Sequence, residues 1–140
     1  FHERLKFMKE PPAKAVEFAE CIRKAEGVII VTPEYNGGYP ASLKNVIDLL
    51  VDEWKRKPVA VCTVSGGAFG GAQVITSLLF TLWKIKAWVV NAHLPVPKVE
   101  EAFTPEGTPL DPEGWTKRTK PFVNELLWAV EAKKRMEQPG

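Results

Sequence analysis

The sequence predicts a single α/β domain in which a parallel sheet is covered by helices on both faces. Apolar residues recur at helical spacing in some segments and form short, continuous β-branched runs in others, and the two patterns alternate along the chain. The connections between them are short, which favours parallel strands joined by right-handed crossovers. A chain of 140 residues has room for one ordinary hydrophobic core, so we expect residues 1–140 to form one domain.

The first helix is expected after two consecutive prolines, with Gly27 in the place of a C-terminal cap. Residues 28–31, Val-Ile-Ile-Val, follow at once and are typical of a strand that is covered on both faces. The apolar face of this helix, at positions i, i+3, i+4 and i+7, consists of Ala15, Phe18, Ala19 and Ile22.

A second helix is expected to begin at Pro40, after a loop at residues 32–39. Basic residues at positions 55–57 would lie in its last turn, where they suit the negative end of the helix dipole and form a solvated basic end. Pro58 then precedes a second buried strand at residues 59–64. The apolar positions of this helix are Leu43, Val46, Ile47, Leu50 and Trp54.

The remaining chain continues the alternation. A glycine-rich loop at residues 65–71 leads into a third helix, and residues 87–90 form a third strand. Residues 95–115 are rich in proline and predict a long surface excursion, followed by a final helix over about residues 120–136. The third helix is expected to bury Ile75, Leu78, Leu79 and Leu82, and the final one Val123, Leu126, Leu127 and Val130.

Composition excludes several classes of function. The chain is 45% apolar and 26% charged, with a net charge of +2, which does not indicate a nucleic-acid surface. No apolar stretch is long enough for a membrane span and no signal peptide is evident, so we expect a cytoplasmic protein with no membrane partner. Cys21 and Cys62 form no metal-ligand cluster, and both are expected to be buried, inert thiols.

Two loops follow the first two strands and are expected to form the walls of one crevice. Ligands of open parallel sheets bind at the carboxyl ends of the strands, where both the first loop (residues 32–39) and the glycine-rich loop (residues 65–71) would lie. Glycines expose backbone N–H groups, and helix N-termini behind both loops add positive dipole ends. With the flat side chains of Tyr35, Tyr39 and Phe69, such a crevice suits a planar, electron-poor heterocycle.

No pair of side chains in or near these loops has the sequence motif of a nucleophile and its base. Ser65 and His93 could form a small hydrolase site, but Ser65 lacks the glycine of a nucleophile elbow and His93 is more typical of a structural strand-end residue. Glu34 could act as an acid or base, or bond nearby backbone amides, and Asn45 could tether the first loop. We therefore expect no catalytic side chain and no metal, and instead chemistry supplied by a bound cofactor.

Several blocks of the chain resemble the NADPH-dependent FMN reductase family, the flavodoxin-like group that includes chromate, quinone and azo-dye reductases. Residues 28–36, which end in Thr-Pro-Glu-Tyr-Asn, and residues 40–48 resemble its signature. Residues 57–71 and 94–99 resemble its second and third blocks. The resemblance implies that the flavin is bordered by Pro33, Glu34, Tyr35, Asn36, Ser65, Gly66 and Gly67, and less firmly by Phe69 and Gly70.

The function implied by the resemblance is an FMN-dependent oxidoreductase. NAD(P)H would give a hydride to bound FMN, and a quinone-like small acceptor would then take the electrons. The alternative is a flavodoxin-like module that binds a partner or serves as a scaffold without catalysis. No arginine stands beside either loop in the sequence, so NADH and NADPH are not distinguished. Trp54 and Trp83 suggest apolar surface that a homodimer or homotetramer would cover.

The chain departs from this family at its beginning. The family's first two strands and its serine-rich loop for the FMN phosphate have no counterpart before residue 12. The sheet should therefore hold three of five strands, with the edge beside residues 28–31 vacant or covered by another molecule. We expect these residues to be the C-terminal part of a chain of roughly 190 residues, or another chain to cover that edge.

Overall fold

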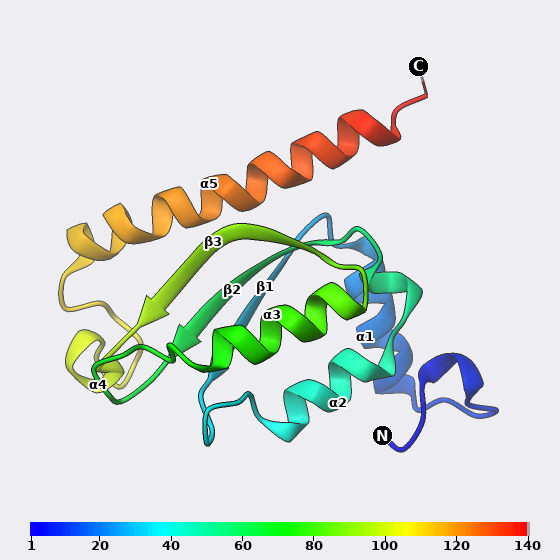
Figure 1. Ribbon diagram of the computed structural model, residues 1–140, viewed down its shortest axis with the longest axis horizontal. Helices are drawn as coiled ribbons and strands as arrows, with labels where there is room; N and C mark the ends of the chain where they lie inside the picture. The colour runs from blue at the N-terminus through cyan, green and yellow to red at the C-terminus, as the bar shows by residue number, and fades with distance from the viewer. Residues whose placement is uncertain (140) are drawn as a thin grey trace.

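A three-stranded parallel sheet forms the centre of the computed structural model, which describes residues 1–139. Its strands are β1 (Val28–Pro33), β2 (Pro58–Val64) and β3 (Trp88–Val96), in the spatial order β1-β2-β3. One face is covered by α1 (Ala13–Lys24), α2 (Ala41–Leu49) and α3 (Val74–Lys84), and the other by α5 (Pro112–Glu137) (Figure 1). Three shorter helical segments are η1 (Leu5–Phe7), η2 (Asp52–Trp54) and α4 (Val99–Ala102). The predicted layered α/β architecture with parallel strands is confirmed.

Two apolar cores lie on opposite faces of the sheet, and β2 contributes to both. Val59 and Val61 pack toward α1, α2 and α3, whereas Ala60 and Cys62 pack toward α5. This alternation follows from the period of two in a strand. β2 is therefore buried on both faces, as its apolar sequence predicts. The first core contains Ala15, Ala19, Ile22, Ile30, Ile47, Leu49, Leu50, Trp54, Val59, Val61, Leu78 and Leu82. The second contains Ala60, Cys62, Val90, Val96, Phe122, Leu126 and Ala129.

β1 is buried on one face only. Ile30 points into the first core, but Ile29 is 44% exposed and Val31 is 63% exposed. The expectation that residues 28–31 are covered on both faces is wrong for the described residues, because the contacts of α5 with the sheet are made to β2 and β3. Within residues 1–139, β2 is the only strand that pairs with β1.

Gly27 has a packing role rather than the predicted capping role. α1 ends at Lys24 with Ala25 as its cap, and Gly27 has no positive φ. A Cβ at Gly27 would lie 2.9 Å from Cγ2 of Val130 in α5. The glycine therefore allows α5 to approach the start of β1 closely.

The second helix is shorter than its apolar spacing predicts. α2 ends at Leu49, and Trp54 lies in η2, where it is buried and donates from Nε1 to the carbonyl of Ile47 at 2.9 Å. Trp54 thus belongs to the core and not to an oligomer surface.

Lys57 is likewise buried rather than part of a solvated basic end. Its ammonium donates to the carbonyls of Arg23 and Ala25, so it caps α1, and burial lowers its pKa.

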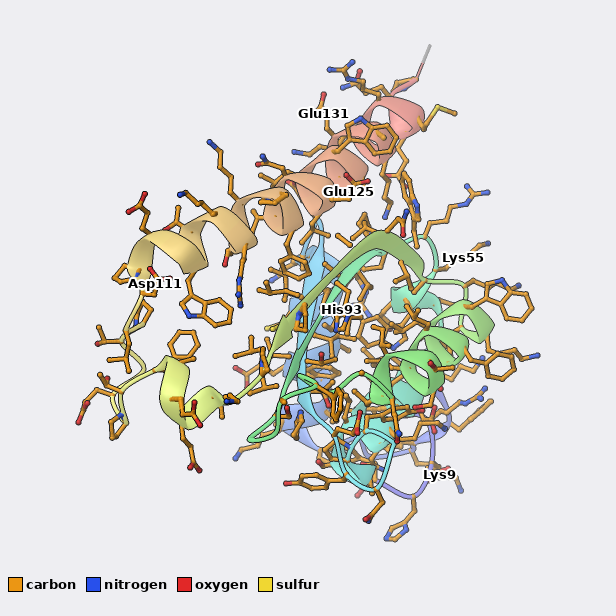
Figure 2. The ribbon with its side chains drawn as sticks, turned by 60° about the vertical axis from the view of Figure 1, so that its left-hand side comes forward. Lys9, Lys55, His93, Asp111, Glu125 and Glu131 are labelled. Atoms are coloured by element: carbon orange, nitrogen blue, oxygen red, sulfur yellow. The ribbon has the colours of Figure 1, made fainter. Side chains whose placement is uncertain are left out.

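The last third of the chain is more regular than predicted. β3 continues to Val96 and includes residues expected to lie beyond the strand. α5 begins at Pro112, where the Asp111 carboxylate accepts from the amide of Gly114 at 3.0 Å (Asp111 is labelled in Figure 2). This acidic cap and a proline in the first turn are strong signals for a helix start, and the helix continues through Pro121.

Three burial assignments are wrong. Leu79 is 39% exposed and Leu127 is 55% exposed, while α5 also buries Phe122, which its predicted apolar face did not include. Cys21 is exposed, whereas Cys62 is buried as expected, and burial raises the pKa of its thiol.

No helix within residues 1–139 is both long and apolar enough to cross a membrane.

Candidate functional site

The two predicted loops begin side by side at the carboxyl edge of the sheet. β1 and β2 are neighbours and parallel, and their last paired residues are Pro33 and Val64. The first loop therefore leaves the sheet next to the glycine-rich loop, as expected for two walls of one site. Each loop is held in place by a different set of contacts.

The first loop closes in a tight turn. Tyr35 and Gly38 exchange backbone hydrogen bonds of 2.7 and 3.0 Å. Asn36 and Gly37 between them have φ values of 53° and 77°, which is the pattern of a type I′ turn. The turn leaves Tyr35 62% exposed beside the sheet edge.

Glu34 connects the first loop to the beginning of α3. Its Oε2 accepts hydrogen bonds of 2.8 Å from the amides of both Gln73 and Val74. A carboxylate at a helix N-terminus satisfies unpaired donors and interacts favourably with the helix dipole. The interpretation that Glu34 bonds backbone amides is confirmed. The N-terminus of α3 is therefore already paired with a carboxylate and does not offer the ligand the positive dipole end that we expected.

Tyr39 and Asn45 are not at the crevice. The Tyr39 hydroxyl lies 2.6 Å from Oγ1 of Thr81 in α3, so its ring helps to pack α3 rather than to line the site. The Asn45 side-chain amide donates to the carbonyl of Phe1 at 2.7 Å. The expected tether between Asn45 and the first loop is therefore wrong.

The glycine-rich loop is fixed at both ends. At its start, the amide of Ser65 donates to Val96 at 3.0 Å, and its carbonyl accepts from Val99 at 3.1 Å. At its end, Gly70 and Gly71 have φ values of 61° and 75°. A Cβ at Gly71 would lie only 2.8 Å from Cβ of Thr63, so both the conformation and the space require glycine.

The middle of the glycine-rich loop is open and rich in donors. A Cβ at Gly66 or Gly67 would have no atom within 4 Å. Among the described residues, no group accepts a hydrogen bond from the backbone amides of residues 66–70. Phe69 is 85% exposed beside them. Unpaired amides next to an exposed aromatic ring suit a flat ligand with several hydrogen-bond acceptors.

The structure does not support a serine nucleophile. The Ser65 hydroxyl donates to the carbonyl of Gly67 at 3.0 Å. His93 bonds to Thr63 instead, with Nε2 at 2.6 Å from Oγ1. Residues 1–139 also contain no group of three His, Cys, Asp or Glu side chains that could hold a metal ion.

The sequence did not indicate one hollow of mixed charge that adjoins the glycine-rich loop. It has a volume of about 240 Å³, and its lining includes Lys98 and Arg118, the acidic Glu101 and Asp111, and Trp115. The amide of Lys98 donates to Gly67 at 2.9 Å, and the Arg118 guanidinium lies 5.1 Å from the centre of the Trp115 ring. Lys98 thus connects this hollow to the glycine-rich loop. Local spacing does not predict the hollow, because the start of α5 forms part of its lining.

Comparisons with known proteins identify the family of this chain. The family described as NADPH-dependent FMN reductase matches residues 2–101. An NAD(P)H-dependent FMN reductase of Schizosaccharomyces pombe is 49% identical over 57 residues, which are 41% of this chain and 28% of the relative. A quinone reductase of Escherichia coli K12 is 44% identical over 84 residues, covering 57% of this chain and 45% of the relative. The chain thus spans less than half the length of these curated relatives.

A solved structure supports the fold. FerB, a flavoenzyme NAD(P)H:(acceptor) oxidoreductase from Paracoccus denitrificans, superposes with a TM-score of 0.78 at 26% sequence identity. The match covers 94% of this chain and 75% of FerB. The predicted flavodoxin-like class is confirmed.

Proposed function

The chain belongs to the NADPH-dependent FMN reductase family, and from this premise we propose that it binds FMN between the first loop and the glycine-rich loop. We propose further that it passes electrons from NAD(P)H to a small acceptor of the quinone type. Relatives named NAD(P)H-dependent FMN reductase and quinone reductase support this function. The observation on this chain that carries it is the set of unpaired amides at residues 66–70, on a loop whose ends are fixed.

The residues of both loops fit a flavin. The amides at Gly66, Gly67, Phe69 and Gly70 can donate to the nitrogen and oxygen acceptors of its ring system. On the first loop, the exposed side chains of Pro33, Tyr35 and Asn36 form the opposite wall. Glu34 and Ser65 contribute differently, because their side chains already hold the loops in position.

Bound FMN would supply two-electron hydride chemistry. The chain's own part is electrostatic, because backbone amides that are already oriented stabilise negative charge on a bound ring without reorganising. Neither Ser65 nor His93 is arranged to move a proton to or from a ligand, since each is hydrogen-bonded within the protein.

Flavin binding is tested by titrating FMN against the natural full-length protein and two variants. Gly66→Val and Gly67→Val place a branched side chain into the open space beside the free amides, and each should weaken FMN binding at least tenfold, or about 1.4 kcal/mol. Thr76→Val, at an exposed site on α3, is the matched control and should leave the affinity unchanged. Unchanged affinity in both glycine variants, with native circular dichroism, would refute this site.

Catalysis is tested by steady-state kinetics with NAD(P)H and a quinone. A single open flavin face serving both substrates in turn predicts ping-pong kinetics, whereas intersecting initial-velocity lines would contradict it. Ser65→Ala should retain activity because the hydroxyl only braces the loop. If the protein binds FMN but NAD(P)H does not reduce the bound FMN, the result would support the alternative of a flavodoxin-like binding or scaffold module without catalysis.

We also propose that the free edge of β1 receives another strand, either from a part of the protein beyond residues 1–140 or from a second chain. Among the described residues only β2 pairs with β1, so the backbone groups along the other edge of β1 are unpaired, and an uncovered edge of this kind favours aggregation. A homodimer or homotetramer is proposed on separate grounds. Phe80 and Trp83 form an exposed aromatic pair on α3, with ring centres 6.0 Å apart. Light scattering of wild-type protein and Trp83→Ser would measure the oligomeric state.

A further inference from the structure

A buried hydroxyl lies directly beneath the end of the glycine-rich loop. Thr63 is fully buried on β2, and its Oγ1 donates to the carbonyl of Gly70. Nε2 of His93 lies 2.6 Å from the same Oγ1. His93 belongs to β3, the neighbouring strand (Figure 2). An imidazole, a hydroxyl and a loop carbonyl thus form a chain of hydrogen bonds that runs from β3 to the loop.

The donor in each bond follows from the number of protons available. A threonine hydroxyl has one proton, and here it goes to Gly70, since a carbonyl oxygen can only accept. Toward His93, the hydroxyl oxygen must then accept, so Nε2 of His93 carries a hydrogen. Burial lowers the pKa of His93, which favours the neutral ring at neutral pH. The ring is therefore expected to be the Nε2–H tautomer.

The Thr63 hydroxyl lies beside the end of the glycine-rich loop, where the backbone is most closely packed. A Cβ at Gly70 would lie 2.9 Å from Cβ of Pro95, and one at Gly71 would lie 2.8 Å from Cβ of Thr63. The backbone here therefore packs directly against β2 and β3. A change in the Thr63 side chain would move the segment that ends the row of free amides at residues 66–70.

We propose that His93 is a positioning residue of the candidate flavin site. By donating from Nε2 to Thr63, it leaves the threonine proton with only the Gly70 carbonyl to bond, and so holds the glycine-rich loop in its open, donor-rich conformation. This role is distinct from that of a base for Ser65, with which His93 makes no hydrogen bond in the described structure. The effect on FMN rests on the proposed function, but the tautomer and the loop conformation do not.

The tautomer is tested by 15N NMR of the imidazole rings in the natural full-length protein. The expected result at neutral pH is a His93 ring protonated at Nε2 and not at Nδ1. His2, whose side chain makes no hydrogen bond among the described residues, is the internal control and should show both tautomers exchanging. A His93 ring protonated at Nδ1 alone would overturn the proposal, because Thr63 would then have to donate in two directions.

Two substitutions separate the hydrogen bond from the bulk of the ring. His93→Gln places an amide donor near the position of Nε2, whereas His93→Leu fills the space without a donor. His93→Leu should shift the amide resonances of residues 66–70 and weaken FMN binding about fivefold, the worth of one hydrogen bond. His93→Gln should restore both to within twofold of wild type. Equal effects of Gln and Leu would show a merely structural role and overturn the proposal.

The Thr63→Val variant tests whether His93 acts on the loop through Thr63. If His93 acts through Thr63, the double variant Thr63→Val/His93→Leu should be no worse than Thr63→Val alone, whereas additive losses would contradict this. Failure of the proposed flavin function can be told apart from failure of the proposed role of His93. Wild-type protein that binds no FMN would refute that function, while the tautomer and the amide resonances of residues 66–70 would still decide the role of His93.

Discussion

β1 and β2 have similar apolar sequences but different surroundings. β2 has a strand on each side and helices on both faces, and its residues from Pro58 to Thr63 are all buried. β1 has one neighbouring strand among the described residues, and Ile29 and Val31 on one of its faces are exposed. A β-branched run therefore specifies a strand, but its neighbours decide how much of it is buried.

The loops that follow the two strands differ in the same way. The first loop is held by a charge, since the Glu34 carboxylate binds the N-terminus of α3. The glycine-rich loop is held by close packing and neutral hydrogen bonds at Thr63, Val96 and Lys98. The β2 side should therefore be sensitive to added volume, and the β1 side to loss of charge.

The largest difference is expected for added methyl groups. Gly71→Ala forces a positive φ on alanine and a collision with Thr63, and should destabilise the fold by about 3 kcal/mol. Gly37→Ala has the same positive φ, but its nearest neighbour is the flexible Gln73 side chain at 3.1 Å. It should cost only about 1 kcal/mol. Urea denaturation measures both, and equal costs would show that packing does not distinguish the two loops.

Removal of methyl groups tests the strands themselves. Val61→Ala in β2 leaves a cavity in the first core and should cost about 2 to 3 kcal/mol. Val31→Ala in β1 should cost less than about 0.5 kcal/mol if the side chain is as exposed as it is here. In the natural full-length protein, a cost for Val31→Ala close to that for Val61→Ala would show that another segment covers this face.

Loss of charge tests the first loop. Glu34→Ala removes both hydrogen bonds to the amides of α3 and should cost about 1 to 2 kcal/mol. Glu34→Gln keeps an acceptor oxygen but no charge, and should lose only about 0.5 to 1 kcal/mol, less at high salt. Glu125→Gln is the control, because Glu125 is exposed on α5 and forms no ion pair among the described residues. A salt-independent loss in Glu34→Gln would argue against the dipole contribution.

The smallest expected effect is a pH dependence of the free energy of unfolding that arises from His93. Burial lowers the pKa of His93 in the folded state, so below about pH 6.5 the unfolded state binds the proton first. Stability should therefore fall as the pH drops from 6.5 through the lower folded pKa, and this fall should be smaller in His93→Gln. Identical pH profiles of unfolding for the two proteins would contradict the shift.

Much of the arrangement was predictable because it depends on local signals. The periodicity of apolar residues predicted the alternation of helices and strands, and short connections predicted parallel neighbours. Those two facts already placed the first loop beside the glycine-rich loop. The family resemblance rested on the same segments, and the match over residues 2–101 confirms it.

Other features depended on partners far away in the chain. Lysine near a helix end was expected to complement the dipole of its own helix, but Lys57 caps α1, because the start of β2 lies beside that helix end. The spacing likewise placed Leu127 on the buried face of α5, but the helix buries Phe122, Leu126 and Ala129 against the sheet instead.

By itself, the sequence determined the order of the elements, the parallel sheet and the loops that form the candidate site. Local periodicity and turn chemistry are properties of neighbouring residues, so they can be read without the fold. Only the tertiary structure decided that Glu34 binds the start of α3, that His93 serves Thr63 rather than Ser65, and that β1 is half-exposed. Each of these depends on packing between segments tens of residues apart, for which local spacing contains no signal.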